Sequence, residues 1–263
     1  MNGPSLGMAS LSLGAGTPLL LLPGLTADHR PPTGLARRAQ LGLMRQLAEH
    51  RQVWWVNRRQ GLSEGTTMAD LAEDYATMLH QWQAAPIDIV GISTGGGVGL
   101  QLAADHPELV RRLVLVASAC RLGPGGHEVE RQALAALERG DRRRAASLVS
   151  RLLPSGRVAA ALAGALGWLL PGGVVAKDFH DLATTMRAEL DFDLSDRLHE
   201  VTAPTLVIGG ELDGFYGEAV FQETAKGLPF GHLLLRPGTS HAKTVVDRSL
   251  GPEINAFLGQ PDS

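Results

Sequence analysis

Short apolar runs alternate with helix-like stretches along most of this chain. The runs have the length and composition of buried strands, and they lie at residues 19–22, 52–57, 87–91, 113–116, 205–208 and 233–235. Helix-like stretches between them cover residues 35–49, 67–84 and 97–106. Because parallel strands are joined through crossover helices, this alternation predicts an α/β fold with a mostly parallel, doubly wound sheet.

The interval from residue 121 to residue 196 breaks the alternation. It contains helical patterns and no convincing strand, and the strand pattern resumes just after Pro204. No Ser/Gly-rich linker flanks the interval, so an excursion from one domain is favoured over the alternative of a separate small helical domain. We therefore predict an α/β core of residues 1–120 and 197–263 with an inserted helical cap of residues 121–196.

The composition excludes several classes of protein. The chain has 263 residues and a formal net charge of -3, so no basic excess marks it as a partner of nucleic acid. Cys120 is the single cysteine, which rules out an intramolecular disulfide and fits a reducing compartment. The first residues do not resemble a secretory signal, and the apolar run at 158–170 is too short to cross a bilayer. We expect a cytoplasmic protein without membrane insertion.

A candidate nucleophile lies in the segment Gly91-Ile92-Ser93-Thr94-Gly95. This G-x-S-x-G pattern directly follows a predicted strand and directly precedes a predicted helix, the context in which a sharp turn presents a serine hydroxyl. Glycine at both ends removes the β-carbons that would clash in so tight a turn. The segment predicts Ser93 as a nucleophile, and the alternative is a glycine-rich turn with an idle serine.

The stretch GISTGGGVGLQLAADHPELVRRLVLVASA, residues 91–119, resembles the nucleophile-elbow region of the α/β-hydrolase fold superfamily. The His-Pro-Glu turn at residues 106–108 is part of this resemblance, and weaker similarity extends from Leu19 to about Phe257. The resemblance implies the fold and a triad in the chain order Ser, acid, His, and it is least informative over the cap. It does not identify the substrate.

Two late loops provide the expected acid and base. Asp213 follows the strand at 205–208, and His241 follows the strand at 233–235. Both side chains would emerge at the carboxyl ends of strands, where open α/β sheets place their sites. Glu211 is an alternative acid, and His29 and His180 are alternative histidines.

The resemblance also implies an oxyanion hole formed by two backbone N–H groups. One belongs to Thr94, directly after the nucleophile, and the other to Leu25, directly after the Pro23-Gly24 pair. The family often has His-Gly where this chain has Pro-Gly. At residues 57–63 the chain also lacks the usual Asp-led turn, and a solvated or structural role is expected for Arg58 and Arg59.

The expected substrate is a small molecule with an apolar acyl group. Apolar residues cover more of the stretch 158–170 than one core-facing stripe requires, so Trp168 and Leu169 are predicted to line the substrate pocket. The alternative is that this helix packs wholly against the other cap helices. No dinucleotide, phosphate-loop or zinc-protease motif is present, so no cofactor and no metal are expected.

These features together predict a serine hydrolase that cleaves a carboxylic ester, lactone or related acyl substrate through a Ser93 acyl-enzyme. The same triad also fits carbon-carbon bond hydrolysis, cofactor-free haloperoxidase chemistry or lyase chemistry. A ligand-binding receptor with little turnover is an alternative from a different class. The sequence does not indicate the oligomeric state.

Overall fold

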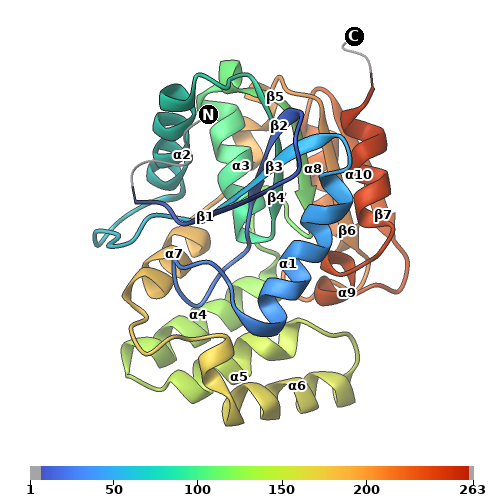
Figure 1. Ribbon diagram of the computed structural model, residues 1–263. Helices are drawn as coiled ribbons and strands as arrows, with labels where there is room; N and C mark the ends of the chain where they lie inside the picture. Colours follow the sequence, from blue (N-terminus) through green and yellow to red (C-terminus); the bar gives the residue numbers. More distant parts are fainter. Residues whose placement is uncertain (1–6, 261–263) are drawn as a thin grey trace.

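The computed structural model describes residues 7–260 and has one seven-stranded sheet at its centre (Figure 1). The strand order is β1-β3-β2-β4-β5-β6-β7, and within it β1 alone runs antiparallel to its neighbour. The strands are β1 (Ser10–Leu13), β2 (Thr17–Leu22), β3 (Arg51–Val56), β4 (Ile87–Ile92), β5 (Val110–Val116), β6 (Thr205–Gly210) and β7 (Gly231–Arg236). The predicted fold class is confirmed, and β1 is an additional edge strand that the sequence pattern did not reveal.

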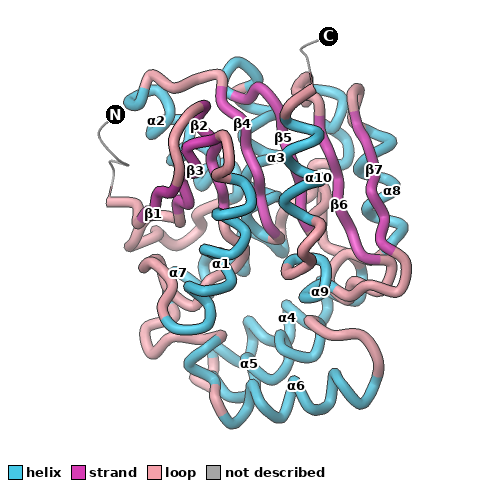
Figure 2. Tube along the Cα trace, turned by 45° about the vertical axis from the view of Figure 1, so that its right-hand side comes forward, coloured by secondary structure: helices cyan, strands magenta, loops and turns pink. Residues whose placement is uncertain are grey.

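Helices cover both faces of the sheet (Figure 2). The helices α1 (Gly34–Leu47) and α10 (Leu250–Leu258) share one apolar cluster with Leu19 and Leu21 of β2. The intervening residues Leu20 and Leu22 join the opposite cluster, which includes α2 (Met68–Trp82), α3 (Thr94–Asp105) and α8 (Glu218–Gly227). Successive strand side chains point to opposite faces, so a strand that is buried on both sides must be apolar throughout.

The helix α2 illustrates how local sequence sets an element's start. The side chain of Thr67 accepts a hydrogen bond from the backbone N–H of Asp70, and the Asp70 carboxylate accepts one from the backbone N–H of Thr67. This capping box satisfies two backbone donors that the first helical turn leaves free.

Four further helices gather beyond one end of the sheet (Figures 1 and 2). They are α4 (Pro124–Glu138), α5 (Arg142–Leu152), α6 (Arg157–Leu169) and α7 (His180–Leu190), and they lie between β5 and β6 in the chain. They build an apolar cluster of their own, to which α4, α5 and α7 contribute buried residues. The chain leaves and re-enters the core at adjacent points, because Arg121 and Asp193 form a β-bridge. We call residues 121–196 the cap.

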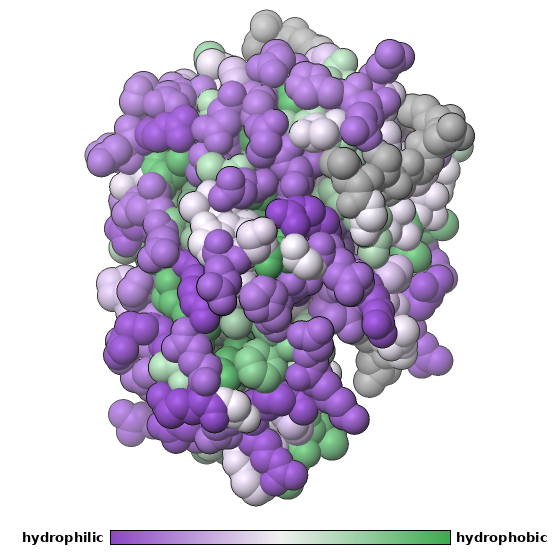
Figure 3. All heavy atoms as spheres, turned by 90° about the vertical axis from the view of Figure 1, so that its left-hand side faces the viewer, coloured by the Kyte–Doolittle hydropathy of each residue, from purple (hydrophilic) through white to green (hydrophobic). Residues whose placement is uncertain are grey.

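The remaining elements are short. They comprise η1 (Pro107–Leu109), η2 (Pro171–Gly173), η3 (Ser195–Glu200) and α9 (His241–Val245). Within residues 7–260, no helix combines the length and the apolar character that crossing a membrane requires. The side of the molecule shown in Figure 3 is mainly hydrophilic, with apolar patches in its lower half.

Candidate active site

Ser93 occupies a sharp turn between β4 and α3. Its backbone has φ 50° and ψ -126°, a conformation that a non-glycine residue adopts only at a cost. A β-carbon on Gly95 would lie 2.3 Å from the carbonyl oxygen of Pro23, and one on Gly91 would lie 2.5 Å from the Cα of Gly96. Both glycines are therefore required by close backbone approach, and the turn has the geometry of a nucleophile elbow.

Asp213 and His241 form a hydrogen-bonded pair at the same edge of the sheet. Nδ1 of His241 lies 2.8 Å from Oδ2 of Asp213, and both side chains are buried. The other carboxylate oxygen of Asp213 accepts hydrogen bonds from the backbone N–H groups of Phe215, at 2.9 Å, and Tyr216, at 3.2 Å. These bonds fix the carboxylate in the orientation that holds the imidazole.

The alternative residues take up other positions. Glu211 is exposed and accepts a hydrogen bond from the backbone N–H of Gly238 at 2.7 Å. The ring of His180 lies 2.9 Å from the carbonyl oxygen of Leu62. The geometry thus favours Asp213 over Glu211 as the partner of His241.

Tyr216 connects the serine to the histidine. Its buried ring stacks on His241 with centroids 6.1 Å apart and an interplanar angle of 18°. Its hydroxyl is close enough to the hydroxyls of Ser93 and Ser118 to interact with them, and burial raises the pKa of Tyr216 well above its ordinary value. Tyr216 was not predicted from the sequence, although its position three residues after the candidate acid could have indicated it.

The predicted oxyanion donors lie beside Ser93. A β-carbon on Gly24 would lie 3.1 Å from the Cβ of Ser93, so the backbone that leads into Leu25 passes close to the serine. The N–H of Thr94 is at the first position of α3, where the helix provides no acceptor for it. The N–H of Thr94 and the backbone that leads into Leu25 are therefore close to the candidate nucleophile, and their use as an oxyanion hole stays a prediction.

A small cavity adjoins these donors. Its volume is only ≈ 20 Å³, room for about one water-sized group. Its walls include Gly24, Leu25, Arg58, Tyr75, Thr94 and Thr185. The neighbourhood of the candidate oxyanion hole is therefore narrow and partly polar.

The prediction that Trp168 and Leu169 line the substrate pocket is wrong. Trp168 is 47% exposed and Leu169 is 62% exposed. The helix α6 packs mainly on α5 and η2 rather than over Ser93. A separate surface hollow beside Trp168 is lined by cap residues alone. The reason is that α6 packs through its small residues. A β-carbon on Gly164 would meet the side chain of Arg151, and one on Gly167 would meet the backbone of Ala146, so the apolar side chains face outward.

Two glutamates of the cap are buried against the site. Oε2 of Glu189 accepts a hydrogen bond from the hydroxyl of Thr94 at 2.7 Å, and Oε1 accepts one from the hydroxyl of Tyr216 at 3.3 Å. Glu130 is close enough to hydrogen-bond with Glu189, and burial raises the pKa of both carboxyl groups. Burial thus favours the protonated form of both carboxyl groups. This pair was not predictable from the sequence, because glutamates on amphipathic helices are usually exposed.

Replacing Glu130 by glutamine should change how stability depends on pH. A carboxyl group with a raised folded-state pKa contributes stability below its unfolded-state pKa, and this contribution is lost as pH rises through the folded-state pKa. The free energy of unfolding should therefore fall between pH 5 and pH 9 more steeply in the wild type than in Glu130→Gln, by on the order of 1 kcal/mol. Urea unfolding at several pH values measures this. Glu138→Gln, at an exposed position of the same helix, is the control, and parallel curves for wild type and Glu130→Gln would contradict the prediction.

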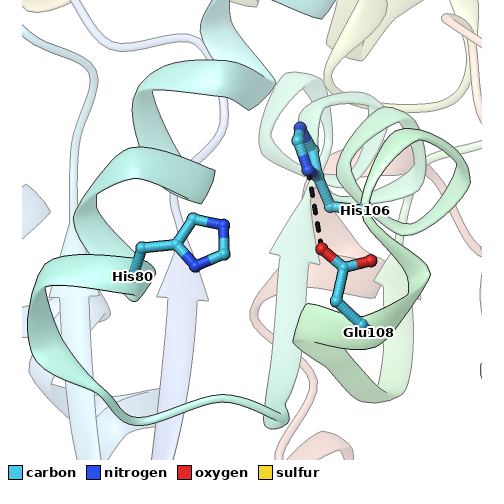
Figure 4. A group of neighbouring side chains, drawn as sticks. All are labelled: His80, His106 and Glu108. Carbon is cyan, nitrogen blue, oxygen red and sulfur yellow. Dashed lines mark ion pairs between the residues drawn. The ribbon is translucent and has the colours of Figure 1, made fainter.

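Within the described part of the chain, residues 7–260, one cluster could offer ligands to a metal, but it lies away from Ser93. His80, His106 and Glu108 each present one ligand atom, and these atoms lie within 4.8 Å of one another (Figure 4). His106 follows the last residue of α3, so the length of this helix, about 18 Å, separates it from the elbow. Nε2 of His106 is also 2.9 Å from Oε2 of Glu73. The cluster has no part in chemistry at Ser93.

Comparisons with known proteins agree with this architecture. The sequence model of the alpha/beta hydrolase fold family matches residues 17–229. RutD of Variovorax paradoxus (strain S110), named as a candidate carbamate hydrolase, is 30% identical over 230 residues, which cover 80% of this chain and 81% of the relative. The chain therefore belongs to the α/β-hydrolase fold family.

Solved structures show the same fold at low sequence identity. The α/β hydrolase MGS-M2, from a Medee basin deep-sea metagenome library, superposes with a TM-score of 0.81 at 17% identity and covers 97% of this chain and 95% of its own. The enol-lactonase of Burkholderia xenovorans LB400 superposes with a TM-score of 0.79 at 19% identity and covers 96% of each chain. The family and the similarity to RutD support a hydrolase as the general class of this protein.

Proposed function

We propose that this protein is a serine hydrolase that cleaves a carboxylic ester, lactone or related acyl substrate through a Ser93 acyl-enzyme. The observation that carries the proposal is the strained turn at Ser93 together with the buried pair of Asp213 and His241 at the same sheet edge. A serine hydroxyl is a weak nucleophile without a base, and an imidazole held by a carboxylate is the usual base.

In the acylation step, Oγ of Ser93 attacks the carbonyl carbon while His241 takes the hydroxyl proton. Asp213 holds the imidazole in the required tautomer and stabilises the imidazolium that forms. The carbonyl oxygen becomes an oxyanion, which accepts hydrogen bonds from the N–H groups of Leu25 and Thr94. When the intermediate collapses, His241 gives its proton to the leaving group.

In the deacylation step, His241 takes a proton from water, and the resulting hydroxide attacks the acyl carbonyl. The same two N–H groups stabilise the second oxyanion, and collapse releases the acid and restores Ser93. The hydroxyl of Tyr216 lies beside Ser93, so it is placed to orient the serine or the leaving group.

The narrow cavity favours short acyl groups. Since the space beside Leu25 and Thr94 measures ≈ 20 Å³, we expect kcat/KM for 4-nitrophenyl esters to fall from acetate through butyrate to octanoate. This reverses the apolar preference expected from the sequence. Release of 4-nitrophenol measures the rates, and Trp168→Ala, on the outer helix α6, should leave the order unchanged. A kcat/KM that rises with acyl length would contradict a small acyl site.

Carbamate hydrolysis is a second candidate function. It is favoured by the similarity to RutD of Variovorax paradoxus, which extends over 80% of this chain. Release of ammonia or amine from a carbamate, assayed beside the short esters, distinguishes the two functions. Carbon-carbon bond hydrolysis, haloperoxidase or lyase chemistry and a receptor role remain alternatives, and a receptor would bind ligand without turnover of any of these substrates.

A further inference from the structure

Arg58 is a buried arginine without a carboxylate partner. It lies two residues after the end of β3 and is 5% exposed, which excludes the solvated role expected of it and leaves the structural one. Its Nη1 donates to the hydroxyl of Thr26 at 2.8 Å and its Nη2 to the carbonyl oxygen of Thr26 at 3.1 Å. Among residues 7–260, no carboxylate forms an ion pair with Arg58, and Asp28 and Asp181 act on its charge only from farther away.

The neighbouring Arg59 shows the ordinary alternative. Its Nε donates to a carboxylate oxygen of Asp74 at 2.9 Å, and its side chain is 30% exposed. The side chain of Arg58 has no such carboxylate partner and little contact with solvent. Burial lowers the pKa of Arg58, but a guanidinium stays charged in proteins. A buried cation is destabilising unless something supplies the opposite charge. An anionic ligand bound at Arg58 would supply it.

Some N–H donors of Arg58 remain free after its hydrogen bonds to the protein are counted. A guanidinium has five N–H donors, and two donate to Thr26, which leaves three. Nε is buried and has no hydrogen-bond partner. An arginine side chain can use such donors together on one carboxylate, because the planar fork matches the spacing of the two oxygens.

The location of Arg58 indicates which part of a substrate would reach it. Arg58 lines the ≈ 20 Å³ cavity together with Leu25 and Thr94, the proposed oxyanion donors, and neither His241 nor Tyr216 lines this cavity. In the proposed reaction, His241 protonates the leaving group, so the leaving group lies on the side of His241. The acyl chain then extends the other way, toward Arg58.

We propose that Arg58 is an anion-binding subsite for a carboxylate at the end of a short acyl chain. The substrate class is then the half-esters of short dicarboxylic acids, such as malonic or succinic acid, whose second carboxylate supplies the missing counter-ion. The cavity beside Arg58 measures only ≈ 20 Å³, so a short acyl chain is favoured over a long one. This inference rests on the proposed hydrolysis at Ser93, because that reaction sets the direction of the acyl chain.

A purely structural role for Arg58 is the competing explanation. Its two bonds to Thr26 hold the loop that carries Leu25, and Nδ2 of Asn57 also donates to the hydroxyl of Thr26 at 2.9 Å. If Arg58 only held this loop, which we call the clamp role, its loss would lower kcat/KM for every substrate alike. An anion subsite would raise kcat/KM only for substrates that carry a carboxylate, so the test must compare substrates of equal size and different charge.

The first measurement compares monomethyl succinate with methyl succinamate, in which a neutral amide replaces the carboxylate. For the wild type, kcat/KM from methanol release should be about ten- to hundredfold higher for the anionic ester, as expected for charge-assisted hydrogen bonds. Arg58→Gln should abolish this preference, so that its loss for the anionic ester exceeds its loss for the succinamate, and Arg58→Lys should retain part of the preference. Arg59→Gln is the matched control and should keep the full preference.

The second measurement separates this inference from the proposed hydrolysis. Calorimetry on Ser93→Ala should show tighter binding of monomethyl succinate than of methyl succinamate, and the difference should disappear in Ser93→Ala/Arg58→Gln. If the wild type cleaves neither ester but this binding difference is found, the hydrolase proposal fails and the anion site stands. Equal kcat/KM and equal binding for the two esters overturn the anion site. An equal loss of kcat/KM for both esters in Arg58→Gln would show that Arg58 only holds the loop, and this result would also overturn the anion site. If Arg58→Gln does not fold, the wild-type comparison and Arg58→Lys decide.

Discussion

Replacing Ser93 by alanine should lower kcat by about 10⁴- to 10⁶-fold and abolish labelling by a fluorophosphonate probe. Such probes react with a serine that a base has already activated, and the turn at Ser93 holds its hydroxyl at the sheet edge that also carries the pair of Asp213 and His241. Steady-state kinetics on a short ester and in-gel fluorescence measure the two effects. Circular dichroism on the variant checks that its fold is intact.

Ser118 is the matched control for this substitution. It is buried and lies near the hydroxyl of Tyr216, as Ser93 does, but it does not stand at the turn between β4 and α3. Ser118→Ala should therefore keep the probe labelling. Ser93 would not be the nucleophile if Ser93→Ala were labelled as strongly as the wild type. The same holds if mass spectrometry located the label on another residue.

Local patterns made much of the fold predictable. Strands buried on both faces must be apolar throughout, so runs such as residues 19–22 and 113–116 stand out in the sequence. The strand β1 was missed because it is four residues long, lies at the edge and is only partly buried. The elbow was predictable for a similar reason, since close backbone approach requires glycine at fixed positions beside Ser93.

Features that depend on tertiary packing were not predictable in this way. The apolar content of α6 is plain in the sequence, but its orientation depends on which face packs on α5, and the small residues Gly164 and Gly167 form that face. Likewise, nothing in the sequence distinguishes Glu189 or Arg58 from surface charges. Their burial follows from the placement of α7 and of the loop after β3 against the site.

Asp213→Asn should lower kcat by about 10⁴-fold with little change in the fold. An asparagine has nearly the same shape as aspartate, but its amide can donate to Nδ1 of His241 and so stabilise the tautomer that cannot accept a proton from Ser93. Loss of the negative charge also removes the stabilisation of the imidazolium that forms during attack. Both effects act on the chemical step, so we expect the loss in kcat rather than in KM, measured by steady-state kinetics on a short ester.

Glu211→Gln provides the control, because Glu211 is the other carboxylate in the loop after β6. It is exposed and bonds the backbone N–H of Gly238 rather than His241, so its substitution should change kcat by no more than a few-fold, as is usual for exposed polar contacts. The two variants differ from the wild type by the same chemical change, two residues apart in one loop. A large loss in Glu211→Gln, or near-normal turnover in Asp213→Asn, would mean that the base is oriented by a group other than Asp213.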